Sequence, residues 1–255
     1  MNFTLKILGT ASAMPISDRN PSAQVLSVHG RLFLIDCGEG TQQQFRRMHL
    51  SFLKVQAVFL SHIHGDHVFG IFGLLSTMAM YGRTQPLEIF APRSFGPVLK
   101  FFLSYFGDGV TYEIVHHPLT MSEPEVVYGQ KELVVKAFPL RHKIETFGFR
   151  FNYRGHGYAY CSDTTPFPEL AGWVRGVDFL YHEATYTKGL EDKAALRFHS
   201  TTEQAARCAA DAGVGQLLIG HYSSRERDPK VYEAECREIF PQTTAAEDGD
   251  VFDIC

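Results

Sequence analysis

The 255-residue sequence has few of the features that would staple, anchor or divide a chain. Its five cysteines are an odd number with no CxxC pair and no regular spacing, which argues against a disulfide framework and against a thiolate zinc site. No window of about 18 uncharged apolar residues occurs, and the first residues, MNFTLKILGT, resemble a strand more than a secretory leader. We therefore expect a soluble, cytoplasmic protein that does not contact a membrane.

An excess of positive charge is also absent. The formal net charge of −4 argues mildly against a protein that grips nucleic acid over a broad face, although local basic patches are compatible with it. No low-complexity tract, internal repeat or Pro/Ser-rich linker divides the chain, and 45% of its residues are hydrophobic, enough to fill a sizeable core. The expectation is a single domain over residues 1–255.

Strand-like and helix-like patterns alternate along the chain. Apolar strand patterns occupy residues 3–9, 24–30, 31–36 and 55–61, several stretches between 87 and 163, and 216–221. Helical patterns occupy residues 41–48, 66–80, 95–106, 201–213 and 228–240. So many apolar strands with helices between them predict an α/β fold in which two mixed β-sheets pack face to face with helices outside.

A cluster of ligand-type residues separates an apolar strand from an apolar helix in AVFLSHIHGDHVFGIFGLL, residues 57–75. His62 and His64 are spaced to bind one metal ion, and Asp66 and His67 to reach a second. A single histidine in such a loop is more often an ordinary polar residue, but four ligand types within six positions favour a metal site.

Further donors follow other apolar runs. His142, Asp163 and His221 each stand where a strand pattern ends, the edge at which layered α/β folds assemble sites from separate loops. Taken singly, each is as well explained as a surface residue. Taken together, they complete a set for two ions: His62, His64 and His142 on one, Asp66, His67 and His221 on the other, and Asp163 bridging both.

Histidine and carboxylate donors in an open site suit two Zn²⁺ per chain, with Mn²⁺ able to replace them. Two divalent ions leave the centre positively charged beside an activated water, and they stabilise both the attacking and the leaving oxygen of a displacement at phosphorus. The donor set therefore predicts a phosphodiester hydrolase that needs no covalent intermediate.

With SHIHGDH and the outlying donors in place, the chain resembles the metallo-β-lactamase superfamily, whose signature is HxHxDH on an αββα sandwich. Within it the sequence is most similar to the ribonuclease Z family of tRNA 3′-processing endoribonucleases. The likeness spans nearly the whole chain and includes LGTASAMPISDRNPSA, DCGEGTQQQ, PLRHKIETFGFR, YCSDT, HEATY, HSTTEQAA and IGHYSSRERD. It implies a homodimer that removes 3′ trailers from precursor tRNA.

The resemblance also implies roles for individual residues. Asp66 is the expected general base, the alternative being a metal ligand only. Glu183 and His199 are expected to form a hydrogen-bonded catalytic pair that protonates the leaving ribose oxygen. The alternatives are that Glu183 orients a ligand histidine and that His199 only begins the helix after it.

Other residues are candidates for supporting roles. Asp36 follows the apolar run LFLI and is expected to fix the imidazole of a metal ligand. Hydroxyl and guanidinium groups that are candidates for holding the substrate phosphate belong to Ser223, Ser224, Arg225 and Arg19, although solvated surface explains each nearly as well.

One departure from the family concerns substrate choice. Many ribonuclease Z chains insert a long arm that grips the tRNA elbow between the equivalents of His142 and Asp163, whereas here 20 residues separate the two and read as two strands with a short turn. The alternative function is therefore a phosphodiesterase of the same core acting on small phosphodiesters or cyclic nucleotides. A non-catalytic metal-binding module and a thioester or β-lactam hydrolase fit the residues less well. The basic residues expected to hold RNA without an arm are Arg46, Arg47, Arg141 and Arg154.

Overall fold

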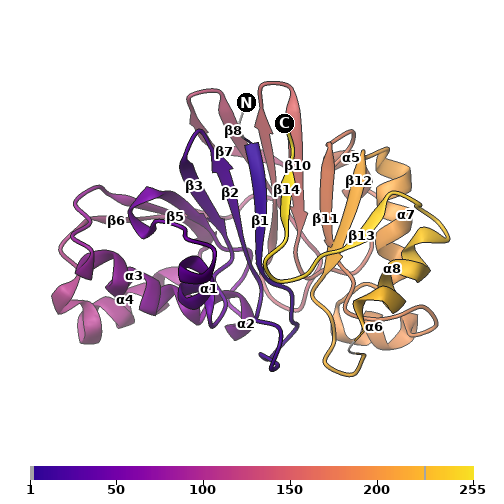
Figure 1. Ribbon diagram of the computed structural model, residues 1–255, viewed down its shortest axis with the longest axis horizontal. Helices are drawn as coiled ribbons and strands as arrows, with labels where there is room; N and C mark the ends of the chain where they lie inside the picture. The colour runs from indigo at the N-terminus through magenta and orange to yellow at the C-terminus, as the bar shows by residue number, and fades with distance from the viewer. Residues whose placement is uncertain (1–2, 227) are drawn as a thin grey trace. The chain divides into compact units, whose positions relative to one another are not determined.

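The computed structural model describes residues 3–226 and 228–255, which fall into two compact units (Figure 1). The first unit comprises the chain up to Thr120 together with Asp248–Asp253 and Cys255. The second comprises Met121–Glu247 together with Ile254. Each unit has its own sheet and its own helices.

The first unit contains a seven-stranded mixed sheet in the order β14-β1-β2-β3-β4-β5-β6. Pairing is antiparallel from β14 to β3 and parallel from β3 to β6. Its strands are β1 (Phe3–Gly9), β2 (Ala23–Val28), β3 (Arg31–Ile35), β4 (Val55–Phe59), β5 (Leu87–Pro92), β6 (Ile114–Leu119) and β14 (Val251–Asp253). Its helices are α1 (Thr41–Arg47), η1 (Phe52–Lys54), α2 (Gly65–Val68), α3 (Gly70–Met80), α4 (Phe95–Phe106) and η2 (Gly107–Gly109).

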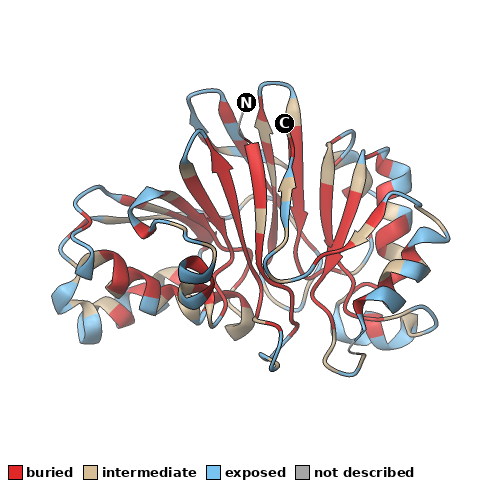
Figure 2. Cartoon of the chain, in the orientation of Figure 1, coloured by how far each residue is buried: buried red, intermediate tan, exposed pale blue. Residues whose placement is uncertain are grey.

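Alternate residues of the central strands form one core with the helices of this unit. Val25, Leu34, Val58 and Ile89 belong to the same buried cluster as Leu74 of α3. Leu32 and Leu34 of β3 both belong to this cluster, two residues apart as in a pleated strand, so one face of the sheet is apolar toward the helices. Figure 2 shows β1 to β5 almost wholly buried while the outer faces of the helices are exposed.

The helix predicted over residues 66–80 is interrupted, which corrects the sequence expectation. The amide of Gly70 donates to the carbonyl of Cys37 at 2.8 Å and so does not continue the helix. A Cβ at Gly70 would lie 2.1 Å from the carbonyl oxygen of Gly38, so only glycine permits this approach. The break at Phe69 lets the short α2 present its residues at the edge of the sheet.

The second unit also contains a seven-stranded mixed sheet, in the order β13-β12-β11-β10-β9-β8-β7. Pairing is parallel from β13 to β10 and antiparallel from β10 to β7. Its strands are β7 (Glu125–Gln130), β8 (Leu133–Pro139), β9 (Phe147–Tyr153), β10 (His156–Cys161), β11 (Phe179–Glu183), β12 (Gln216–Gly220) and β13 (Thr243–Ala245). Its helices are α5 (Leu170–Trp173), α6 (Glu191–Arg197), α7 (Thr202–Ala212) and α8 (Pro229–Arg237).

Helix α7 packs on β11 and β12 through its alanines (Figure 1). Thr201 caps it in a capping box, in which the Thr201 side chain accepts from the Gln204 amide and the Gln204 side chain accepts from the Thr201 amide. Gly213 ends the helix in the left-handed conformation at φ 61°. The helix expected over residues 201–213 is confirmed, with its first and last residues as the two caps.

Two tight turns close the hairpins of the second unit. Arg154 and Gly155, at φ 51° and 89°, connect β9 to β10, and Lys131 and Glu132, at φ 47° and 71°, connect β7 to β8. Arg154 forms an ion pair with Glu132 at 2.7 Å, so the two turns hold each other. No long insertion interrupts the chain between β9 and β10.

Candidate metal centre

The first unit places its ligand-type residues at the carboxyl end of its parallel strands. His62 follows β4, His64 precedes the first turn of α2, and Asp66 and His67 lie within α2. Asp36 follows β3, the strand that pairs with β4. Loops at the carboxyl ends of parallel strands are where α/β sheets place binding groups, so the fold gathers these five residues.

The imidazoles of this cluster converge. His62 Nε2 lies 3.0 Å from His64 Nδ1, and the two rings are nearly perpendicular, at 81°. Two nitrogens bound tetrahedrally to one zinc ion at about 2.0–2.1 Å each would lie about 3.3–3.4 Å apart, close to the observed separation. His67 Nε2 lies 3.6 Å from Asp66 Oδ2, forming a second pair of donor atoms.

Asp36 supports this cluster from behind. Its Oδ2 accepts a hydrogen bond from His67 Nδ1 at 2.8 Å, and its two oxygens also accept from the amide and the hydroxyl of Ser61 at 2.7 and 2.8 Å. Ser61 Oγ in turn lies 3.0 Å from His62 Nδ1. A carboxylate on one imidazole nitrogen leaves the other as the metal-binding atom, so the surroundings fit a metal ligand at His67.

Two backbone features keep the Asp36 loop close to α2. Asp36 itself has φ 53°, an unusual value for a non-glycine residue. A Cβ at Gly38 would lie 2.5 Å from the carbonyl oxygen of Asp66, so this position requires glycine. Asp66 Oδ2 accepts from the amide of Ala13 at 2.7 Å, which fixes its carboxylate.

The second unit places its donors in the same way. Asp163 lies just beyond β10, Glu183 ends β11 and His221 follows β12, at the carboxyl ends of three parallel strands. His142 lies just beyond β8. Asp163 is at the centre of this group, with its oxygens 3.3 Å from His221 Nε2 and 3.7 Å from His142 Nε2.

The remaining nitrogens of these histidines have hydrogen-bond partners that fit metal ligands. His142 Nδ1 donates to the carbonyl of Phe198 at 2.8 Å, and His221 Nδ1 lies 2.8 Å from Thr185 Oγ1. Both rings therefore present Nε2 to Asp163. Burial lowers the pKa of His142, more strongly than Asp163 raises it, and favours the neutral imidazole that binds metal.

Glu183 organises the loops behind this group and is completely buried. Its Oε1 accepts from the amides of Thr164 and Ser200 at 3.2 and 2.9 Å and from His199 Nδ1 at 3.1 Å. Its Oε2 accepts from the amide and hydroxyl of Thr185 at 2.9 and 2.8 Å. Burial alone would raise the pKa of Glu183, but the neighbouring histidines and these hydrogen bonds outweigh it and lower the pKa to about 2.

The structure thus pairs Glu183 with His199, and it adds hydroxyl residues that the sequence did not single out. Thr185 Oγ1 is shared among Glu183, His199 and His221, and Ser61 contacts both Asp36 and His62. Only their position in the sequence points to these two residues: Ser61 directly precedes HIHGDH, and Thr185 lies within HEATY.

The phosphate candidates have different surroundings. Ser223 and Arg225 line a cavity of the second unit, and Ser224 lies between them in the same loop. Arg19 is only 7% exposed and lies near Asp248. Burial raises the pKa of the Asp248 carboxyl group, and the charge of Arg19 opposes this rise. Arg19 is therefore placed as an internal cation of the first unit.

The candidate RNA-holding arginines are also engaged within their own units. Arg141 pairs with Glu169 at 3.3 Å, and Arg154 pairs with Glu132. Arg46 lies over aromatic rings, and Arg47 donates to the side chain of Gln44 at 3.3 Å. All four have local partners that any RNA contact must share.

Comparison with known proteins defines the class to which this fold and these donors belong. The sequence model of the Beta-lactamase superfamily domain matches residues 31–222, about three quarters of the chain. The chain therefore belongs to the beta-lactamase superfamily, and its two mixed sheets with clustered histidines and carboxylates are those of the metal-dependent metallo-β-lactamase fold.

Individual relatives narrow the assignment. Ribonuclease Z of Bacteroides thetaiotaomicron is 35% identical over 296 aligned positions, which cover 97% of this chain and 94% of the relative. Ribonuclease Z of Bacteroides fragilis is 34% identical and covers 97% of each chain. The crystal structure of the short form of human tRNase Z superposes with a TM-score of 0.88 at 29% identity over 99% of both chains. Within the superfamily, the chain belongs to the ribonuclease Z family.

The Bacteroides thetaiotaomicron relative is longer within the aligned region. Its 296 aligned positions contain about 247 residues of this chain (97% of 255), so roughly 49 positions of the relative have no counterpart here. This chain is thus a compact form of the enzymes that it resembles.

Proposed function

We propose that the protein is a zinc-dependent endoribonuclease that removes 3′ trailers from precursor tRNA by attack of water on a phosphodiester. The observation that carries this proposal is the 35% identity to a ribonuclease Z over nearly the full length of both chains. The positions of the donor residues at the carboxyl ends of parallel strands in each unit support it.

The proposed metal ligands come from both units. His62, His64 and His142 would hold one zinc ion, Asp66, His67 and His221 the other, and Asp163 would bridge them. Support comes from each unit separately. In His67, His142 and His221, Nδ1 has a hydrogen-bond partner in the protein, and Nε2 faces a neighbouring ligand-type residue. When bound, two such ions lower the pKa of water and stabilise charge on the reacting phosphate, and manganese can substitute.

The chain's own residues would carry the protons. Asp66, with a carboxylate oriented by the Ala13 amide, would accept the proton of the attacking water. His199, whose Nδ1 donates to Glu183, would present Nε2 to the departing ribose oxygen and donate a proton there. Glu183 is enclosed by five donors, which suits a residue that orients His199 and holds its charge.

Cytoplasmic location and a homodimer belong to the same proposal. No helix in the described part of the chain combines the length and the apolar character needed to span a bilayer. Exposed aromatic side chains gather on α4, where the ring of Tyr105 contacts those of Phe101 and Phe106. A cluster of this kind is typical of a surface that a partner covers, so a second copy of the chain is proposed there.

The β9–β10 turn is a specific observation in favour of the alternative substrate class. Arg154 and Gly155 close this hairpin where many relatives carry an arm, which removes a contact remote from the reacting phosphate. Such a loss mainly weakens RNA binding and leaves the chemistry intact. A small phosphodiester should therefore be hydrolysed readily, and precursor tRNA should be bound weakly and with strong salt dependence.

The experiment is a comparison of the two substrates. Zinc-loaded protein is assayed on a precursor tRNA with a 3′ trailer and on a chromogenic phosphodiester at several salt concentrations, with product ends mapped. Cleavage after the acceptor stem that leaves a 3′-hydroxyl supports the proposal. Brisk hydrolysis of the small diester without RNA cleavage would assign the protein to the alternative.

A further inference from the structure

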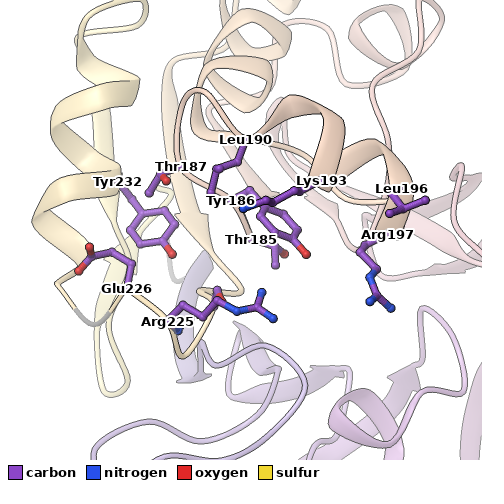
Figure 3. A pocket seen from close by; sticks show the side chains of 11 residues that line it. Thr185, Tyr186, Thr187, Leu190, Lys193, Leu196, Arg197, Arg225, Glu226 and Tyr232 are labelled. Atoms are coloured by element: carbon purple, nitrogen blue, oxygen red, sulfur yellow. Dashed lines mark hydrogen bonds between the residues drawn. The ribbon is translucent and has the colours of Figure 1, made fainter.

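A cavity of about 360 Å³ lies in the second unit beside α6 (Figure 3). Its walls come from the loop after β11, from α6 and the residue before it, and from the loop after β12 and the adjoining α8. The volume lies within the range of about 300–1,000 Å³ that is typical of small-molecule sites.

The cavity is lined by three cations and one carboxylate. Lys193 and Arg197 stand one helical turn apart on the exposed face of α6, and Arg225 approaches from the loop after β12. Glu226 is the acidic residue of the lining. Among the described residues, no carboxylate forms an ion pair with Lys193, Arg197 or Arg225 within 4.0 Å. Three such cations around one cavity favour an anionic ligand.

The rest of the lining is apolar and aromatic. Leu190 and Tyr186 line the same cavity and lie above the two arginines in the view of Figure 3. An aromatic ring beside guanidinium and ammonium groups is the combination that binds a nucleotide, because the ring faces the base and the cations face the phosphate.

The cavity adjoins the predicted proton donor. Its wall residue Thr185 lies 3.3 Å from His199 Nδ1 through Oγ1, and the Tyr186 ring centre lies 6.2 Å from that of His199. Tyr186 is also held by backbone hydrogen bonds with Ser200 and Thr202, on either side of the helix cap. A group bound in the cavity would lie next to the scissile phosphate without displacing any proposed metal ligand.

We infer that this cavity binds one nucleotide of the RNA strand, next to the bond that is cleaved, with its phosphate held by Lys193, Arg197 and Arg225 and its base against Tyr186 and Leu190. This inference rests on the proposed function, because it names a subsite of the same enzyme. It gives the armless chain a source of RNA affinity on the body of the second unit.

The test measures binding of adenosine 5′-monophosphate to the zinc-loaded protein by calorimetry, with inorganic phosphate as the second ligand. The test variant is Lys193→Glu/Arg197→Glu. The matched control is Lys136→Glu, an exposed charge reversal on β8 of the same unit that is not part of the cavity lining. The milder Lys193→Gln/Arg197→Gln variant serves if charge reversal impairs folding, which circular dichroism reports.

We expect adenosine monophosphate to bind more tightly than phosphate, and the test variant to lose at least about tenfold in affinity while the control stays within twofold. Nucleotide binding to the test variant should also depend less on salt than binding to the wild type, because fewer cations remain to attract the phosphate. Equal binding of phosphate and nucleotide, or unchanged nucleotide affinity in the test variant, would overturn the inference. Precursor tRNA cleavage by the wild type is measured on the same sample, so that failure of the proposed function is seen separately.

Discussion

Replacing Glu183 by glutamine tests whether this buried carboxylate holds the loops of the second unit together. The carboxylate accepts five hydrogen bonds, three on Oε1 and two on Oε2. A glutamine oxygen in the Oε1 position can still accept from Thr164, Ser200 and His199, but its amide then faces Thr185. The Thr185 hydroxyl can turn to accept, whereas the Thr185 amide loses its acceptor.

The cost follows from these contacts. One buried donor without an acceptor costs about 1–3 kcal/mol, and each remaining bond loses about 1 kcal/mol when its acceptor is no longer charged. Relief of the desolvation of the charge offsets part of this sum, so we expect Glu183→Gln to lower the free energy of unfolding by about 3 kcal/mol. The shift of the Glu183 pKa from 4.5 to about 2 corresponds to a similar figure of about 3 kcal/mol at 1.36 kcal/mol per pH unit.

The assay is urea unfolding of chelator-treated protein followed by circular dichroism, with Glu169→Gln as the control. Glu169 is about half exposed and pairs with Arg141 at the surface, so its replacement should change stability by less than about 1 kcal/mol. The folded-state pKa of Glu183 lies below its ordinary value, so the carboxylate stabilises fully above about pH 4.5, and the stabilisation fades as pH falls through about 2. A difference in unfolding free energy between wild type and variant of less than about 1 kcal/mol at pH 7, or a difference that is as large at pH 2.5 as at pH 7, would show that the Glu183 carboxylate does not stabilise the fold.

Two further substitutions separate metal binding from proton transfer. His199→Ala should keep both zinc ions yet lower turnover by roughly 10²–10⁴-fold, with a smaller loss on a nitrophenolate ester whose leaving group needs no proton; equal losses on both substrates would argue against proton donation. Asp36→Asn should weaken zinc binding about 10–100-fold in competition with a chelator, since Asp36 fixes His67 Nδ1, and unchanged affinity would remove that role.

Much of the fold follows from local patterns in the sequence. The helix expected over 95–106 is α4, and the threonine cap and glycine stop of α7 are where their side-chain chemistry places them. By contrast, β11, β13 and β14 are short strands with no alternating pattern, so no local signal identifies them. The break at Phe69 depends on Cys37, a tertiary contact that periodicity within a helix cannot report.

Some features of the candidate site could likewise be predicted from the sequence, and others could not. The SHIHGDH cluster, His142, Asp163 and His221 stand out in the sequence because each of these four follows an apolar run, and the end of an apolar run predicts the end of a strand. The contacts of Glu183 with the Thr164 and Ser200 amides do not stand out, since they join backbone groups far apart in sequence. The cavity beside α6 combines cations from two separate elements, and each alone has the appearance of an ordinary surface charge.

Counting the zinc ions bound per chain tests whether the donor residues form a two-metal centre. Wild-type protein and Asp163→Ala are reconstituted with zinc, desalted and analysed for metal and protein. We expect two ions per wild-type chain and weakened binding of both in Asp163→Ala, because Asp163 lies within 3.7 Å of nitrogens of both His142 and His221. No more than one ion in the wild type, or one ion fully retained in the variant, would contradict a two-metal centre bridged by Asp163.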